Sequence, residues 1–326
     1  MTRAVTAIRT VMAFAVLAAG SSCASGTSAP AAQTPVISEL PASSNTATAR
    51  SSAAPHILVI VEENRGYTAT LGACADDPYL CSLAAAYASL SSWYAISHPS
   101  APNYLALESG STQGVGSDCT PDGGGCGPFR ASDLGSELSA AGVPWVAYME
   151  GMPSACDRVG GAGEYAEKHN PFLYFSANRG SGCGTHVVPY PGPDAMVARL
   201  DSNRSPDFVW VTPNLVHDMH DGSVAEGDAW LRSNLPGVLT SRWFADHGTV
   251  IITMDENDAE PSGSCCSSAA GGRVPMIVIS ANARGRGAIA TTGDHYSTLR
   301  AIEEAFGVRL LGGAASAGGD LSAIFG

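Results

Sequence analysis

From residue 56 onward, two patterns of hydrophobic and polar positions alternate along the chain. Short runs of β-branched and other apolar residues predict strands, and the run at 56–61 is continuous, as in a strand buried on both faces. The stretches between these runs have the pattern of helices. The predicted strands are 56–61, 93–97, 144–149, 208–212, 249–254 and 274–280, and the predicted helices are 80–90, 102–107, 133–141, 194–200, 225–239 and 296–306. Strands alternating with helices predict an α/β domain with a mostly parallel central sheet and helices on both faces.

The first 54 residues have a different composition. Arg3 and Arg9 precede a short apolar run at 11–19, which with the small residues after it predicts a signal peptide over 1–23. Cys23 is a candidate for lipid attachment and hence for a membrane tether, with a plain secreted protein as the alternative. Residues 24–54, mostly Ser, Ala, Thr and Pro, cannot bury enough apolar surface to fold and predict a disordered linker. We therefore expect a folded domain at 55–326 in a protein that is secreted or anchored in the cell envelope.

Charge and cysteine content narrow the function further. A net charge of -13 excludes a protein that binds nucleic acid through a basic surface, and an anionic substrate would need local cations, such as a bound metal.

Nine cysteines leave eight without Cys23, an even number that predicts disulfides in an exported chain. Nearness in sequence favours three pairs, while Cys265 and Cys266 are adjacent. A cysteine zinc site is the alternative, but the spacings form no paired C-x-x-C motifs. The favoured pairs are Cys74–Cys81, Cys119–Cys126 and Cys156–Cys183.

Polar residues gather directly after the predicted strands. In open α/β sheets, ligands bind outside the carboxyl ends of the strands, so these residues would meet at one edge. Each cluster alone is compatible with an ordinary polar loop. Together, in a chain with only 14% charged residues, they predict a metal site. The clusters are 62–64, Glu150, the residues Asn214, His217, Asp218, His220 and Asp221, and 255–258.

Ser100 lies between a predicted strand and a predicted helix. We expect it at the helix N-cap, with Pro102 in the first turn, where proline is tolerated. A serine there can simply cap the helix. A helix N-terminus also favours anions, and a serine that touches a metal can ionise and attack phosphorus. The motif alone leaves both roles open.

These motifs, taken together, resemble a known family. The chain is similar to the bacterial phosphoesterase family that includes acid phosphatases and non-specific phospholipases C, in the alkaline phosphatase superfamily. The resemblance runs in family order over nearly all of 56–306. The matching stretches are 63–65, 98–104, Tyr165 with 168–172, 212–215 with 217–222, 255–256 and 294–297.

The resemblance implies roles for individual residues. Ser100 would be the nucleophile that is transiently phosphorylated, with His169 and His220 as further catalytic residues. Asn103, Lys168 and His169 would bind substrate. Carboxylate ligands suit Ca²⁺, Mg²⁺ or Mn²⁺, whereas added histidines favour zinc or iron. The metal ligands it implies are Glu63, Asn64, Ser100, Asp255 and Glu256, with Asp218, His220 and His295 where superfamily members place a second metal or phosphate-binding histidines.

The sequence thus predicts an exported, metal-dependent phosphoesterase that hydrolyses phosphomonoesters through a phosphoserine, like an acid phosphatase. A phosphodiesterase of the phospholipase C type is one alternative, and a non-catalytic envelope lipoprotein that binds metal or polysaccharide is another. A sulfatase is less favoured, because the Pro-x-Arg that follows a sulfatase nucleophile is absent after Ser100. The G-x-S-x-G motif of α/β-hydrolases is also absent.

Overall fold

The computed structural model describes residues 54–325 except 161–162, 259–262, 267–268 and 283–286. The predicted signal peptide, Cys23 and nearly all of the predicted linker lie outside these residues. In the described part of the chain, no helix is both long enough and apolar enough to cross a membrane.

A nine-stranded sheet forms the centre of the fold, which confirms the predicted α/β class. Its strands lie in the order β4 (Val187–Pro189), β3 (Trp145–Met149), β5 (Phe208–Thr212), β1 (His56–Glu62), β6 (Gly248–Met254), β8 (Met276–Ser280), β2 (Ala88–Tyr94) and β7 (Arg273–Val274), and β9 (Gly287–Asp294) joins at β2. The first five strands in this order, β4 to β6, are all parallel. Strand β8 is antiparallel to β6 and β2, while β9 runs parallel to β2.

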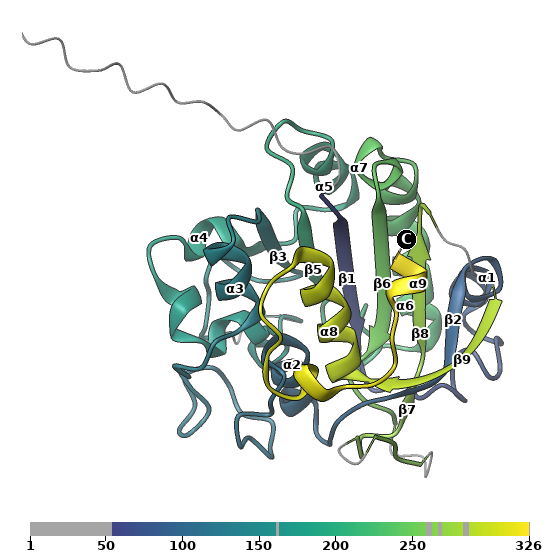
Figure 1. Ribbon diagram of the computed structural model, residues 1–326, viewed down its shortest axis with the longest axis horizontal. Helices are drawn as coiled ribbons and strands as arrows, with labels where there is room; N and C mark the ends of the chain where they lie inside the picture. The colour runs from purple at the N-terminus through teal and green to yellow at the C-terminus, as the bar shows by residue number, and fades with distance from the viewer. Residues whose placement is uncertain (1–53, 161–162, 259–262, 267–268, 283–286, 326) are drawn as a thin grey trace, which may run out of the picture. The chain divides into compact units, whose positions relative to one another are not determined.

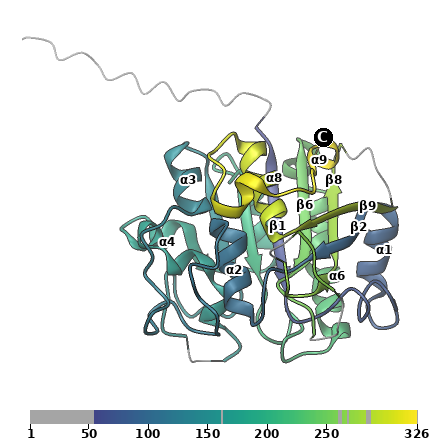
Figure 2. The same ribbon diagram turned by 60° about the horizontal axis from the view of Figure 1, so that its bottom comes forward.

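Helices pack in two groups, one on each face of the sheet (Figures 1 and 2). The group towards the viewer in Figure 1 contains α2 (Ser100–Ser109), which contacts α3 (Leu134–Ala140) and α8 (His295–Phe306). In the other group, α6 (Val224–Leu239) contacts its three neighbours. These are α1 (Pro78–Ala86), α5 (Pro193–Leu200) and α7 (Arg242–Ala245). The shorter elements are α4 (Cys183–His186), α9 (Ser322–Phe325) and the 3-10 helices η1 (Glu167–His169), η2 (Pro171–Tyr174), η3 (Ser176–Arg179) and η4 (Gly312–Ser316).

The largest differences from the sequence prediction lie at the boundary between α1 and β2 and at β9. The helix predicted to reach residue 90 ends at Ala86, and the strand predicted to begin at 93 begins at Ala88. Residues 88–90 pair with β8 on one side and with β9 on the other, and this pairing outweighs the helical propensity of Ala and Leu. Strand β9 was not predicted, because it consists largely of Gly, Ala and Thr with alternating partial exposure.

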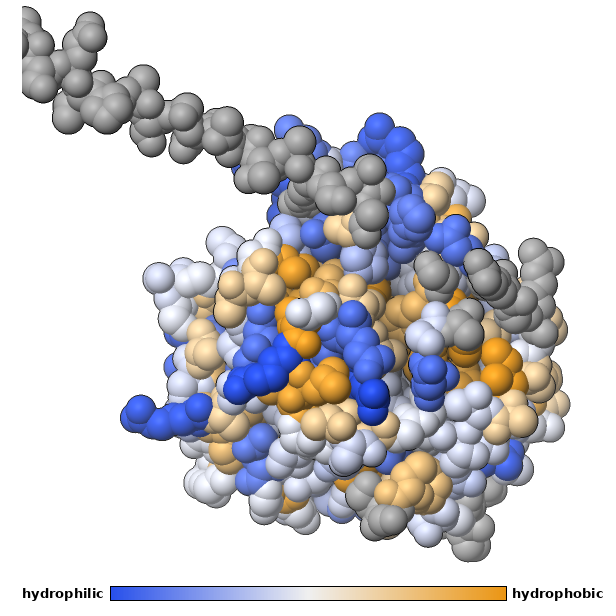
Figure 3. Space-filling view, in the orientation of Figure 1, coloured by the Kyte–Doolittle hydropathy of each residue, from blue (hydrophilic) through white to orange (hydrophobic). Residues whose placement is uncertain are grey.

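The core lies between the sheet and each helical layer. Its largest fully buried side chains include Trp93, Tyr104 and Trp210. At Gly293, a Cβ would lie 2.4 Å from the Trp93 ring, so this position requires glycine. On the face shown in Figure 3, hydrophobic and hydrophilic side chains are interspersed around α8.

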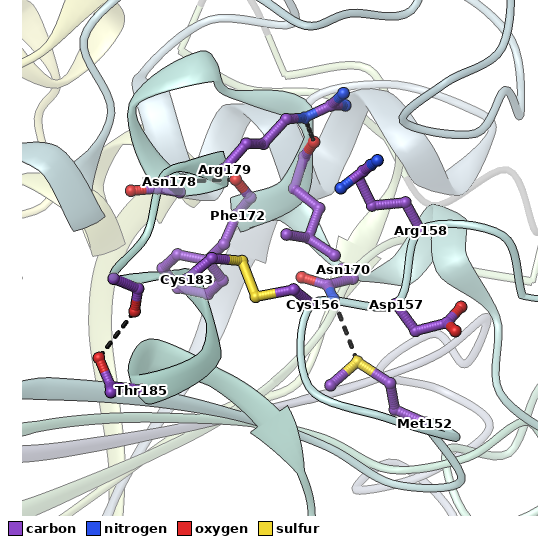
Figure 4. The surroundings of a disulfide bond; sticks show 12 residues. Met152, Cys156, Asp157, Arg158, Asn170, Phe172, Asn178, Arg179, Cys183 and Thr185 are labelled. Carbon is purple, nitrogen blue, oxygen red and sulfur yellow. Dashed lines mark hydrogen bonds between the residues drawn. A yellow bond between two sulfur atoms is a disulfide. The ribbon is translucent and has the colours of Figure 1, made fainter.

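The three predicted disulfides are confirmed, and Cys265 pairs with Cys266. Cys156–Cys183 connects the segment after β3 to α4. Figure 4 shows this disulfide close to Asn170, whose amide lies 3.9 Å from the Met152 sulfur. The site residues 168–169 lie within the loop that this disulfide closes.

Candidate active site

The ends of β1 and β6 bring the first predicted ligands together. Glu62 pairs with Met254 in register, so Glu63 and Asp255 follow at the same edge of the sheet. The Asn64 backbone N–H donates to Asp255 Oδ1 (3.0 Å), and the Asn64 amide donates to Glu63 Oε2 (3.1 Å). Carboxylates far apart in sequence thus share one buried site, as the strand-end pattern predicted.

Ser100 faces this site from the start of α2. The helix begins at Ser100 itself, with Pro99 at the N-cap, so the N-cap prediction is wrong by one residue. The Ser100 hydroxyl is 3.0 Å from Glu63 Oε2 and 3.4 Å from Glu256 Oε1. It therefore interacts with carboxylates instead of capping the helix, which favours the catalytic interpretation over the structural one.

Three buried carboxyl groups at this edge repel one another. Burial, followed by the charges of Asp255 and Asp218, raises the pKa of Glu63 well above its usual value. Burial raises the pKa of Asp255 to about 6. Burial and the charge of Asp255 raise the pKa of Glu256 to about 9. Such groups must hold protons or share a cation.

A divalent cation fits this donor set. Glu63 and Glu256 lie within hydrogen-bonding distance of Ser100, Asp255 accepts from Asn64 beside Glu63, and hard cations prefer oxygen ligands. Asp255 Oδ2 is buried and has no hydrogen-bond partner among the described residues. A carboxylate oxygen in that state is costly unless a cation or proton satisfies it.

A histidine pair lies on one side of the carboxylates. His169 Nε2 is 3.0 Å from Glu63 Oε1, and His169 Nδ1 is 3.4 Å from Asp218 Oδ2. The His169 ring stacks on Tyr104, and its centroid is 5.7 Å from that of His220. Burial lowers the pKa of His169 well below its usual value, so this ring is neutral. Ligand atoms of Glu63, His169 and His220 lie within 4.8 Å of one another, close enough to hold a metal ion together.

Two predicted site residues make contacts that point to other roles. Asn103 is fully buried, its Oδ1 accepts from the backbone of Ile96 and Ser97, and its amide donates to Ser97 and Pro99. These four bonds use the whole hydrogen-bonding capacity of the Asn103 side chain, which points to a role in shaping the loop before Ser100 more than to the expected contact with substrate.

His295 makes a contact beyond its predicted role. Its Nε2 is 2.5 Å from the backbone oxygen of Asp255, and burial lowers the pKa of His295 to about 4. This contact supports the backbone of Asp255, while His295 Nδ1 is buried without a hydrogen-bond partner among the described residues, so the metal contact expected for His295 stays a prediction.

Two further residues at the site were missed from the sequence. His98 Nδ1 is 2.5 Å from Glu256 Oε2. In the sequence, His98 stands out only as the first residue of the matching stretch 98–104, with no role of its own. Asp118 accepts from the Ala101 backbone N–H (3.1 Å) and from Lys168 Nζ (2.6 Å). Asp118 lies in a segment without periodic pattern, so no sequence signal marked it.

Comparison with known proteins identifies the chain. The family model described as "Phosphoesterase family" matches residues 73–309, well over half of the chain. The chain belongs to the phosphoesterase family. This phosphoesterase is 34% identical over 263 residues to a phosphatidylinositol-3-phosphatase of Mycobacterium tuberculosis, with 80% of each chain covered. It is 26% identical over 232 residues to an acid phosphatase of Aspergillus fumigatus, covering 68% of this chain but 49% of that protein.

Solved structures support the fold of this phosphoesterase. A protein of the alkaline phosphatase superfamily from Vibrio parahaemolyticus aligns with a TM-score of 0.53 at 12% identity, covering 78% of this chain and 66% of that one. At this identity the likeness concerns the fold alone. The predicted membership of the phosphoesterase family and of the alkaline phosphatase fold is thus confirmed, and the chain is a phosphoric ester hydrolase.

Proposed function

We propose that this protein is an exported, metal-dependent phosphatase that cleaves phosphomonoesters through a phosphoserine at Ser100. The observation that carries this proposal is the hydroxyl of Ser100, which faces Glu63 and Glu256 at the end of the sheet. A serine that only capped a helix would instead bond to backbone N–H groups.

Glu63, Asn64, Asp255 and Glu256 would hold one divalent cation beside Ser100. When bound, the cation would lower the pKa of the hydroxyl and neutralise phosphoryl oxygens. The carboxylate cluster supports this assignment because its charges need compensation. Oxygen-rich ligands favour Ca²⁺, Mg²⁺ or Mn²⁺.

The reaction would proceed in two displacements. In the first, Ser100 Oγ bonds to phosphorus while the bond from phosphorus to the leaving alcohol breaks. The Ser100 proton leaves along its hydrogen bond to Glu63. The partly exposed His220 would give a proton to the leaving oxygen. In the second, water attacks phosphorus and gives a proton to His220 while the bond from phosphorus to Ser100 Oγ breaks. Ser100 Oγ takes back the proton held by Glu63, and phosphate is released.

The neutral His169 would orient the phosphoryl group. Its ring is fixed by Tyr104, Glu63 and Asp218, so the side chain is held before substrate arrives. Lys168 would supply a positive charge for phosphoryl oxygens in an otherwise acidic protein.

The relatives support a monoester substrate. One is named a phosphatidylinositol-3-phosphatase and another an acid phosphatase, and both names describe phosphomonoester hydrolysis. Export is supported by the N-terminal composition and by four disulfides, which persist in oxidising compartments.

A substrate panel tests this function. The purified protein would be assayed with p-nitrophenyl phosphate, bis-p-nitrophenyl phosphate and p-nitrophenyl sulfate, before and after chelation and with each divalent cation added back. We expect turnover of the monoester, its loss on chelation and its recovery with a divalent cation. Preferred turnover of the diester or sulfate would refute the monoester assignment, and full activity after chelation would refute the metal assignment.

A further inference from the structure

Asp118 connects the two segments that carry the proposed nucleophile and the proposed phosphate-binding lysine. Its Oδ1 accepts from the backbone N–H of Ala101, the residue after Ser100. Its Oδ2 accepts from Nζ of Lys168, the residue directly before His169 in the chain. One carboxylate therefore bridges the start of α2 and the 3-10 helix η1.

Both ends of this bridge are held by the surrounding chain. The disulfide Cys119–Cys126 closes the loop that follows Asp118. The Tyr174 hydroxyl lies within hydrogen-bonding reach of the backbone oxygen of Cys119 and of Lys168 (3.3 Å). The side chains of Lys168 and Asp118 are 21% and 32% exposed, so the ion pair can still be reached by a substrate.

The negative charge of the site explains why the Lys168 ammonium needs a partner that fixes its position. A lysine has a flexible four-carbon stem, so its ammonium occupies a defined place only when a partner fixes it. The charges of Glu63 and Asp255 act on Lys168 as well as that of Asp118. Without Asp118, the ammonium would be drawn towards the carboxylates that are proposed to hold the cation.

We propose that Asp118 is a positioning residue that holds the Lys168 ammonium beside Ser100 and away from the proposed metal ligands. There the ammonium meets the phosphoryl oxygens of the substrate, so Asp118 acts on substrate binding through Lys168. This role rests on the proposed phosphatase function.

The test is a double-mutant cycle with Asp118→Asn and Lys168→Met. Asparagine has the shape of aspartate and can still accept from the Ala101 N–H, so the variant mainly loses the charge that holds Lys168. We expect Asp118→Asn to lower kcat/KM for p-nitrophenyl phosphate about tenfold, mostly through a higher KM. In the Lys168→Met background, the same substitution should change kcat/KM less than about twofold.

Asp122→Asn is the matched control. Asp122 lies in the loop closed by Cys119–Cys126, shortly after Asp118, and also forms ion pairs, with Arg158 (2.9 Å) and Arg179 (2.6 Å). Among the described residues it makes no bond to Ala101 or Lys168. It should keep kcat/KM within about twofold of the parent. Thermal unfolding of all variants checks that the fold is retained.

Three results would overturn the proposal: unchanged or higher kcat/KM in Asp118→Asn, an equal loss in the Lys168→Met background, or an equal loss in Asp122→Asn. Phosphoserine formation at Ser100 is measured on the same variants. If the phosphoserine forms while the cycle shows no coupling, the positioning role fails and the proposed function stands. If no phosphoserine forms in the parent protein, the serine mechanism itself fails.

Discussion

Replacing Asp255 by asparagine should change metal binding and stability in opposite directions. The substitution keeps the shape of the side chain, and the new amide oxygen can still accept from the Asn64 backbone N–H. It removes one of the three carboxylates proposed to hold the cation. We therefore expect the metal concentration for half-maximal activity to rise about 10–100-fold, with partial recovery of turnover in excess metal.

The metal-free protein should become more stable above about pH 9. The charge of Asp255 is the second cause, after burial, of the raised pKa of Glu256. Because Glu256 with a folded pKa of about 9 is protonated at neutral pH, relaxing that pKa by about one unit raises the free energy of unfolding by ~1.4 kcal/mol only above about pH 9. For a domain of this size, that corresponds to a Tm about 2–4 °C higher in chelator at about pH 10.

The assays are metal titration of p-nitrophenyl phosphate turnover and thermal unfolding with and without chelator. Asp246→Asn is the control, because it removes the same charge from an exposed position after α7. An unchanged metal requirement in Asp255→Asn would refute the assignment of Asp255 as a ligand. A lower Tm in chelator at about pH 10 would refute the account of mutual repulsion.

Three other predictions test separate parts of the structure. Burial raises the pKa of Glu303 to about 8, so the folded state binds a proton that the unfolded state releases, and stability should fall as pH rises from about 5 to 8. Glu303→Gln, measured by chemical unfolding across this range, should reduce that slope; an unchanged slope would contradict the assignment. Asn103→Ala should lower the unfolding free energy by about 2–4 kcal/mol and reduce kcat more than it raises KM, because it frees backbone N–H groups of the loop before Ser100; a change in KM alone would restore Asn103 as a substrate ligand. Replacing Cys156 and Cys183 together by serine should cost roughly 3–4 kcal/mol in unfolding experiments, given their separation of 27 residues; a Tm within 1–2 °C of the parent would contradict this.

Most of the parallel sheet could be predicted because its strands carry unbroken apolar runs. β1, β5 and β6 are buried on both faces, and this burial leaves a strong sequence signal. β9 gave no such signal, because its alternating small and polar residues become a strand only by pairing with β2. The boundary between α1 and β2 was missed for the same reason: long-range pairing decides it.

The site shows the same division between local and long-range information. The carboxylates Glu63 and Asp255 could be placed from strand ends, since parallel strands end at one edge. The contacts of Asn103 and Asp118 could not, because each depends on how a loop folds back onto the start of α2. Sequence motifs predict which residues gather at a site, whereas hydrogen-bond partners decide what each of them does there.

The identity of the nucleophile is the central claim, and trapping the covalent intermediate tests it most directly. The protein would be mixed with a phosphomonoester, quenched in acid and digested, and its phosphopeptides mapped by mass spectrometry. The account predicts phosphate on the peptide containing Ser100. In Ser100→Ala the phosphopeptide should be absent and turnover should fall by roughly 10⁴–10⁶-fold. Near-normal turnover in Ser100→Ala, or phosphate trapped on a different residue, would contradict it.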